Sequence, residues 1–107
     1  MSDNGQTVGR GRRTYLVEHY WPGVTADAFG SAAADLRSST EALAAERNAI
    51  RFLHSTLVPE DEAAFCVFEA ESQALVEEAY ARAGVRFERI RDAVESGARP
   101  QPKGERP

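Results

Sequence analysis

Five side chains that can do chemistry stand within the apolar segments of this chain: Glu18, His19, His54, Cys66 and Glu69. Together they offer a thiol, imidazole nitrogens and carboxylates, a donor set that suits a first-row transition metal better than calcium or magnesium. Each has an ordinary structural reading as well, since a lone buried cysteine commonly packs as a small hydrophobic residue. An arginine such as Arg89 or Arg91 would neutralise Glu18 without any metal.

No local motif supports these residues. The sequence has no CxxC, HExxH or HxH, and no P-loop, nucleophile elbow or dinucleotide fingerprint. Any site must be assembled from separate segments by the fold. Because Cys66 is the single cysteine, an internal disulfide framework is excluded, and a reducing compartment is indicated.

The elements that must position these side chains alternate between strand and helix patterns. Apolar and β-branched runs between turn residues predict strands at residues 14–20, 50–58 and 64–70, and a last one within 85–95. Apolar residues at three- and four-residue steps predict two helices, with Thr25 and Ser72 as their N-caps. The first helix is expected to end near Asn48 and the second at Gly84, residue types that tolerate the left-handed cap conformation.

This order predicts an α+β protein with the ferredoxin-like βαββαβ fold, a four-stranded antiparallel sheet with two helices on one face. Ile90 and Val94 are the expected inward residues of the last strand. Because successive strand residues point to opposite faces, Phe65 and Cys66 make both faces of the sheet apolar. The helices cover one face, so we expect a second copy to cover the other, in a homodimeric α/β barrel.

Strand alternation limits which candidates can share a site. Glu18 and His19 must point to opposite faces of the sheet. The first and third strands are neighbours in this fold, which could bring Glu18 near Cys66. His54 shares a face with Cys66 only if the hairpin pairs residues whose numbers sum to an even value, and the sequence leaves that register open.

The composition bounds the partners of the protein. A chain of 107 residues holds one domain, expected at 13–96, with flexible tails at 1–12 and 97–107. The net charge is −4, and the acidic residues are concentrated between the two basic ends, which argues against nucleic acid as the main partner. No apolar run has the length of a membrane span or the form of a secretory signal, so a cytoplasmic protein is expected.

Five short segments carry a recognisable pattern: YLVE at 15–18, PGVT at 22–25, RFLHS at 51–55, FCVFEA at 65–70 and ARAG at 81–84. This pattern resembles a small ferredoxin-like domain family of unknown function that includes nickel-binding proteins. The resemblance implies a dimeric barrel that in some members binds nickel. It also brings Tyr80 into the candidate set, because relatives often have a histidine there. The predicted metal ligands are thus Glu18, His54, Cys66, Glu69 and Tyr80, for nickel or another first-row transition metal.

Three functions remain open from the sequence. The first is a non-enzymatic transition-metal-binding protein. The second is a cofactor-free dimeric-barrel enzyme of isomerase or monooxygenase type, acting on a small molecule in a cavity lined by Tyr80, Trp21 and His19. The third is an interaction module without a site.

Overall fold

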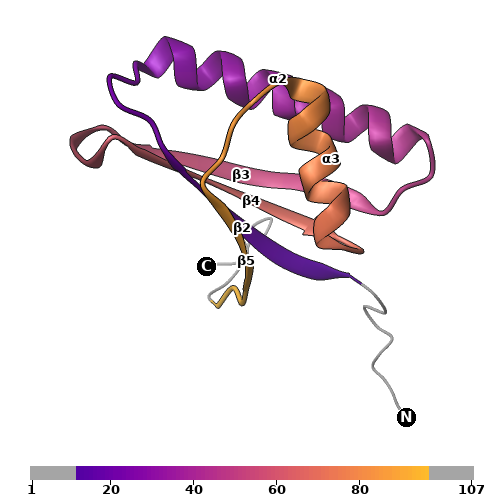
Figure 1. The fold of residues 1–107 in the computed structure, drawn as a ribbon. Helices are drawn as coiled ribbons and strands as arrows, with labels where there is room; N and C mark the ends of the chain where they lie inside the picture. The colour runs from indigo at the N-terminus through magenta and orange to yellow at the C-terminus, as the bar shows by residue number, and fades with distance from the viewer. Residues whose placement is uncertain (1–11, 97–107) are drawn as a thin grey trace, which may run out of the picture.

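The computed structural model describes residues 12–96, and its elements follow the predicted βαββαβ order (Figure 1). They are β2 (Arg13–Tyr20), α2 (Ala26–Ala45), β3 (Ile50–Val58), the short 3-10 helix η1 (Pro59–Asp61), β4 (Ala63–Ala70), α3 (Gln73–Ala83) and β5 (Arg89–Ala93). The predicted tails, apart from Arg12, lie outside the described residues.

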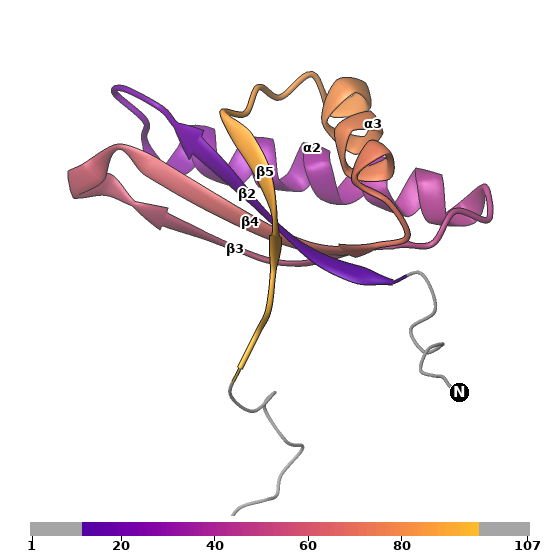
Figure 2. The ribbon, with the colours of Figure 1, turned by 60° about the horizontal axis from the view of Figure 1, so that its bottom comes forward.

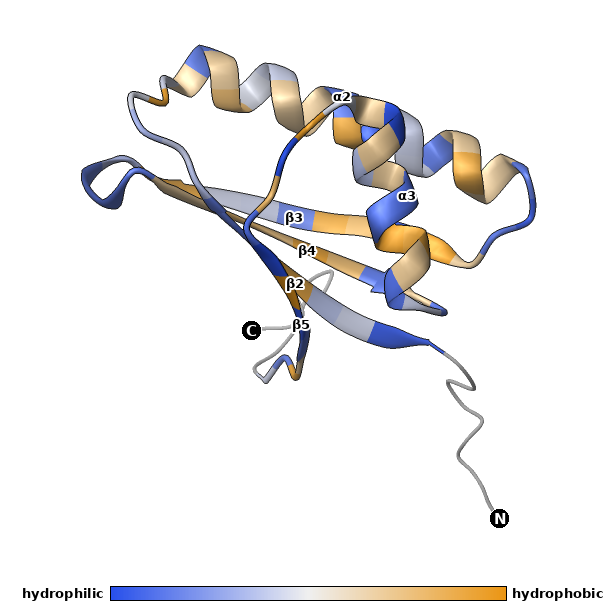
Figure 3. Cartoon of the chain, in the orientation of Figure 1, coloured by the Kyte–Doolittle hydropathy of each residue, from blue (hydrophilic) through white to orange (hydrophobic). Residues whose placement is uncertain are grey.

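The four strands form one antiparallel sheet in the order β3-β4-β2-β5, which confirms the ferredoxin-like fold. Figures 1 and 2 show both helices on one face of this sheet. The hydrophobic segments of β3 and β4 lie beneath them (Figure 3). No helix in the described range 12–96 is long and apolar enough to span a bilayer.

Local chemistry sets the ends of the helices as predicted. The hydroxyl of Thr25 accepts a hydrogen bond from the backbone N–H of Ala28 (3.0 Å), and Ser72 does the same for Leu75 (3.3 Å). Each bond satisfies an amide that has no partner within its own helix. Gly84 ends α3 with a φ of 70°, the left-handed conformation that a residue without Cβ adopts at low cost.

Two predicted details are wrong. Asn48 was expected to take the left-handed conformation after α2, but Arg47 takes it, with a φ of 74°. The side-chain amide of Asn48 instead donates a hydrogen bond to the carbonyl of Leu43 (3.1 Å), in the last turn of α2. In the last strand Ile90 packs against the core, whereas Val94 lies beyond β5 and is 94% exposed.

The sheet has two unlike faces. On the helix side lie the alternate residues Tyr15, Val17 and His19 of β2, and Ala64, Cys66, Phe68 and Ala70 of β4. We call the other side the open face; its central strands carry Leu16, Glu18, Phe65, Val67 and Glu69. The open face is apolar only in its middle, since both glutamates lie on it. Its pairing with a second copy stays a prediction.

Candidate functional site

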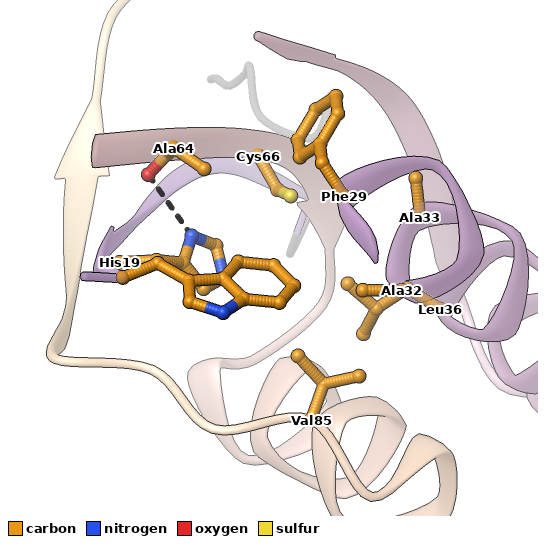
Figure 4. A pocket seen from close by; sticks show the side chains of 9 residues that line it. His19, Phe29, Ala32, Ala33, Leu36, Ala64, Cys66 and Val85 are labelled. Carbon is orange, nitrogen blue, oxygen red and sulfur yellow. Dashed lines mark hydrogen bonds between the residues drawn. The ribbon is translucent and has the colours of Figure 1, made fainter. Parts of the chain in front are cut away.

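The imidazole of His19 is held inside the protein on the helix side of the sheet, where it is 6% exposed. Its Nδ1 lies 3.0 Å from the carbonyl oxygen of Ala64 on the neighbouring strand (Figure 4). A carbonyl can only accept a hydrogen bond, so Nδ1 must carry the proton. In the neutral ring Nε2 is then an acceptor.

Tyr80, on the inner face of α3, supplies the donor for that acceptor. Its hydroxyl lies 2.9 Å from Nε2 of His19, and the residue is 1% exposed. Burial lowers the pKa of His19, an effect that the bond to Ala64 and the charge of Glu88 offset only in part. The ring is neutral at pH 7, and the Tyr80 O–H donates to it.

Cys66 completes this group. It is 2% exposed and lies on the same face of the sheet as His19, one strand away. Burial raises the pKa of its thiol, and the neighbouring hydroxyl of Tyr80 offsets part of that rise. Burial also raises the pKa of the Tyr80 hydroxyl, and the neighbouring Cys66 adds to the effect. These three residues, which we call the core polar cluster, are therefore held in their uncharged forms.

The cluster borders a small cavity between the sheet and α2. Its volume is about 10 Å³, close to the room that a single water molecule needs. Its lining is otherwise apolar (Figure 4) and consists of His19, Trp21, Phe29, Ala32, Ala33, Leu36, Ala64, Cys66 and Val85. A larger groove of about 710 Å³ lies beside it, and the two share His19, Trp21, Ala32 and Val85.

Three of the five predicted ligands lie on the opposite side of the sheet. Phe52 pairs with Phe68, but a β-bulge follows, and His54 then pairs with Val67. The bulge shifts the register so that Ser55, not His54, is opposite Cys66 and shares its face. Since Val67 is on the open face, His54 is too, together with Glu18 and Glu69. The expected approach of Glu18 to Cys66 is wrong, because the register pairs Cys66 with Val17.

The charged residues of the open face are satisfied by one another. Arg89 and Arg91 hold the carboxylate of Glu18 at 3.2 and 3.3 Å, so the arginine partner considered from the sequence is confirmed, from both residues. Glu69 lies 3.2 Å from Arg51 and 3.6 Å from Arg12. The imidazole of His54 lies 3.5 Å from a carboxylate oxygen of Glu95. Within residues 12–96 no group of three His, Cys, Asp or Glu side chains could hold a metal ion.

Cys66 and Tyr80, both predicted as ligands, thus lie in this cluster, whereas the predicted ligand set did not include His19, which the structure places beside Tyr80. One signal was present, since His19 and Tyr80 had both been expected to line a cavity. The charged residues at the groove were not predicted, because Asp35 on α2 is distant in the sequence from Arg86 and Glu88 in the α3–β5 connection, and all three are exposed.

Comparisons with known proteins agree with this fold. The family model described as nickel responsive protein SCO4226-like matches residues 15–92. The crystal structure of SCO4226 from Streptomyces coelicolor A3(2) is similar with a TM-score of 0.62 and 21% sequence identity, over 78% of this chain and 99% of that chain. A comparison with curated proteins finds no match. The family match covers most of the chain, and the protein belongs to the nickel responsive protein SCO4226-like family.

Proposed function

We propose that this protein binds a transition-metal ion, with nickel as the first candidate, at the core polar cluster. The observation that carries the proposal is the meeting of a thiol and an imidazole at one small cavity beside a groove. Sulfur and imidazole nitrogen are donors that nickel, copper and zinc accept well. The description of the family names a response to nickel, which selects that ion for the first test.

The residues of the cluster fit such an ion in part. Cys66 would bind as a thiolate and His19 through Nε2. The Nδ1–H bond from His19 to Ala64 fixes the ring, as a second hydrogen bond does in most metal-binding histidines. Tyr80 now occupies Nε2 and would have to release it. The cluster therefore offers two strong donors and a neutral phenol.

The proposal keeps Cys66 and Tyr80 from the predicted ligands and adds His19. It leaves out Glu18 and Glu69, because two arginines already neutralise each of them on the open face. It also leaves out His54, which lies on that face beside Glu95.

Titration of tag-free protein with Ni²⁺ tests the proposal, with heat and the near-ultraviolet thiolate-to-metal band as readouts. We expect Cys66→Ser and His19→Gln each to weaken binding by about tenfold or more, the usual effect of disturbing a ligand shell. Glu69→Gln is the matched control and should bind as the wild type does. Thermal unfolding of each variant verifies that it is folded. Equal affinity in the wild type and Cys66→Ser would refute the site, and a loss confined to Glu69→Gln would move it to the open face.

We also propose that the protein is a homodimer joined through the open face. Leu16 and Phe65 are half-buried and make an apolar centre there beside Val67, which is already buried within the chain, and the ion pairs of Glu18 and Glu69 surround it. Sedimentation at micromolar concentration should give twice the mass of the 11.7 kDa chain. Phe65→Asp should give the single chain, whereas Ala81→Asp, an equal change of charge on the exposed side of α3, should not. A wild-type particle of 11.7 kDa would contradict the dimer.

A further inference from the structure

A surface groove lies outside the small cavity of the core polar cluster, which we call the inner cavity. Three segments that are distant in the sequence form it: the end of β2 with the turn after it, the first half of α2, and the connection from α3 to β5. Figure 1 shows this connection leaving the end of α3 and running down to the sheet. With a volume of about 710 Å³, the groove has the size of a small-molecule site.

Hydrogen bonds hold two of these segments in place. The amide of Glu88 donates to the carbonyl of Glu18 (2.8 Å), which ties the α3–β5 connection to β2. The turn after β2 is held by Glu62. Its carbonyl accepts a hydrogen bond from the amide of Trp21 (2.7 Å), and its carboxylate accepts one from the amide of Gly23 (2.9 Å). The walls are therefore formed before a ligand arrives, which reduces the entropy that binding would cost.

The charges of the lining favour a cation. Asp35 on α2 and Glu88 in the α3–β5 connection are both exposed, and among residues 12–96 neither carboxylate forms a salt bridge. The charge of Glu88 acts on His19, which places this carboxylate toward the inner end of the groove. Among the described residues of the lining, the guanidinium of Arg86 is the one permanent positive charge, so the carboxylates outnumber it by two to one.

Two aromatic side chains border the same space. Tyr20 is 60% exposed, and Trp21 is half-buried. Aromatic rings attract organic cations through their faces and also pack against flat apolar groups. Ala28 and Ala32 of α2 and Val85 of the α3–β5 connection add apolar surface between the charges. The lining thus matches a molecule that has an ammonium group and a flat apolar body.

We propose that this groove binds an aromatic amine, whose ammonium group pairs with Asp35 and Glu88 and whose ring packs against Trp21. Arg86 makes the proposal selective, because its charge opposes a simple amine but would attract a ligand that also carries a carboxylate. The proposal does not depend on the metal site, since none of these four side chains belongs to the core polar cluster.

Phenethylamine is the probe, and Trp21 is the reporter, because it is the single tryptophan of the chain. The titration follows Trp21 fluorescence of the full chain, is repeated by calorimetry, and contains a chelator that keeps metal ions away. We expect saturable binding with a dissociation constant of about 1 mM or lower, a modest affinity for so small a ligand. Higher salt should weaken it. 2-Phenylethanol has the same ring without the charge and should bind about fivefold more weakly or less.

Single substitutions assign the charges. Asp35→Asn and Glu88→Gln should each weaken phenethylamine binding by about two- to fivefold, the range of one ion pair at an exposed site. Arg86→Gln should strengthen it by a similar factor. Glu41→Gln removes the same charge from an exposed position of α2 that does not line the groove, and it should bind as the wild type does. Thermal unfolding verifies that each variant is folded.

Several results would overturn the proposal. Phenethylamine may not saturate the protein by about 10 mM, a concentration that even a weak specific site should reach; 2-phenylethanol may bind equally well; or Glu41→Gln may have the same effect as Asp35→Asn. Tighter binding of L-phenylalanine than of phenethylamine, abolished in Arg86→Gln, would assign the groove to a zwitterion instead. Because the chelator is present throughout, any of these failures leaves the proposed metal site standing, and failure of the nickel titration leaves the groove proposal standing.

Discussion

Removing the hydroxyl of Tyr80 tests the core polar cluster most directly. Tyr80→Phe keeps the ring, its contacts with Phe68 and Phe87, and nearly all of its volume. It deletes the donor to Nε2 of His19, which is 2.9 Å away in a nearly dry part of the core. The perturbation is thus one hydrogen bond and not a cavity.

The expected cost follows from what the deletion leaves behind. Nε2 of His19 becomes a buried acceptor without a donor. The ring proton is on Nδ1, where it donates a hydrogen bond to the carbonyl of Ala64. Such an orphaned group lowers the free energy of unfolding by about 1–3 kcal/mol. For a domain of this size, each kcal/mol lowers Tm by about 4–8 °C. The adjoining cavity of about 10 Å³ is at the lower limit for one water molecule, so water is a poor replacement for the lost donor.

Urea and thermal unfolding, followed by circular dichroism, measure this cost. Tyr20→Phe is the matched control, since Tyr20 is 60% exposed and its hydroxyl has no partner among the described side chains. It should change stability by less than about 0.5 kcal/mol. If Tyr80→Phe is as stable as the wild type, the hydroxyl is not the partner of His19 in solution, and the assignment of tautomer and cluster is refuted.

Four further predictions follow from the same structure. Burial lowers the pKa of His19 from 6.5, so below pH 6.5 the unfolded chain binds a proton at this histidine more readily than the folded chain does. The free energy of unfolding should therefore fall as the pH drops below 6.5, and His19→Gln should remove this dependence on pH. Burial raises the pKa of Cys66 from 9.0, so stability should fall above pH 9 in the wild type and less in Cys66→Ser. Gly84→Ala should cost about 1–2 kcal/mol in urea unfolding, from the left-handed backbone alone, since no other atom lies within 4 Å of the added Cβ. Ser39→Ala should cost about 1 kcal/mol, because its hydroxyl joins α2 to the carbonyl of Ala79 on α3 (2.8 Å); unchanged stability would show that this bond contributes nothing.

Local chemistry explains why the fold could be read from the sequence. Thr25, Ser72 and Gly84 act on their own helix ends, so their roles depend on neighbours within a few residues. The strands followed from alternation and turns in the same way. The two wrong details are shifts of one residue at the end of an element. Arg47 has the left-handed conformation that was expected of Asn48, and β5 ends at Ala93, one residue before Val94.

The face on which His54 lies could not be read in the same way, because it depends on a single extra residue in β3. Without the bulge between Phe52 and His54, the pairing of Phe52 with Phe68 would continue to place His54 opposite Cys66. With it, every later residue of β3 faces the other side. Nothing in the local sequence marks this bulge. The bond between His19 and Tyr80 is equally hidden, since 61 positions separate the two residues.

The two faces of the sheet differ in what a divalent cation would meet there. At Glu18 it would approach two guanidinium groups, which remain on the open face even if the carboxylate turns toward the metal. Among residues 12–96 no lysine or arginine lines the inner cavity of the core polar cluster, and the charge of Glu88 lies close enough to act on His19. The barrier there is protonation, because Cys66 must lose a proton that its burial retains. Metal affinity at this cluster should consequently rise with pH.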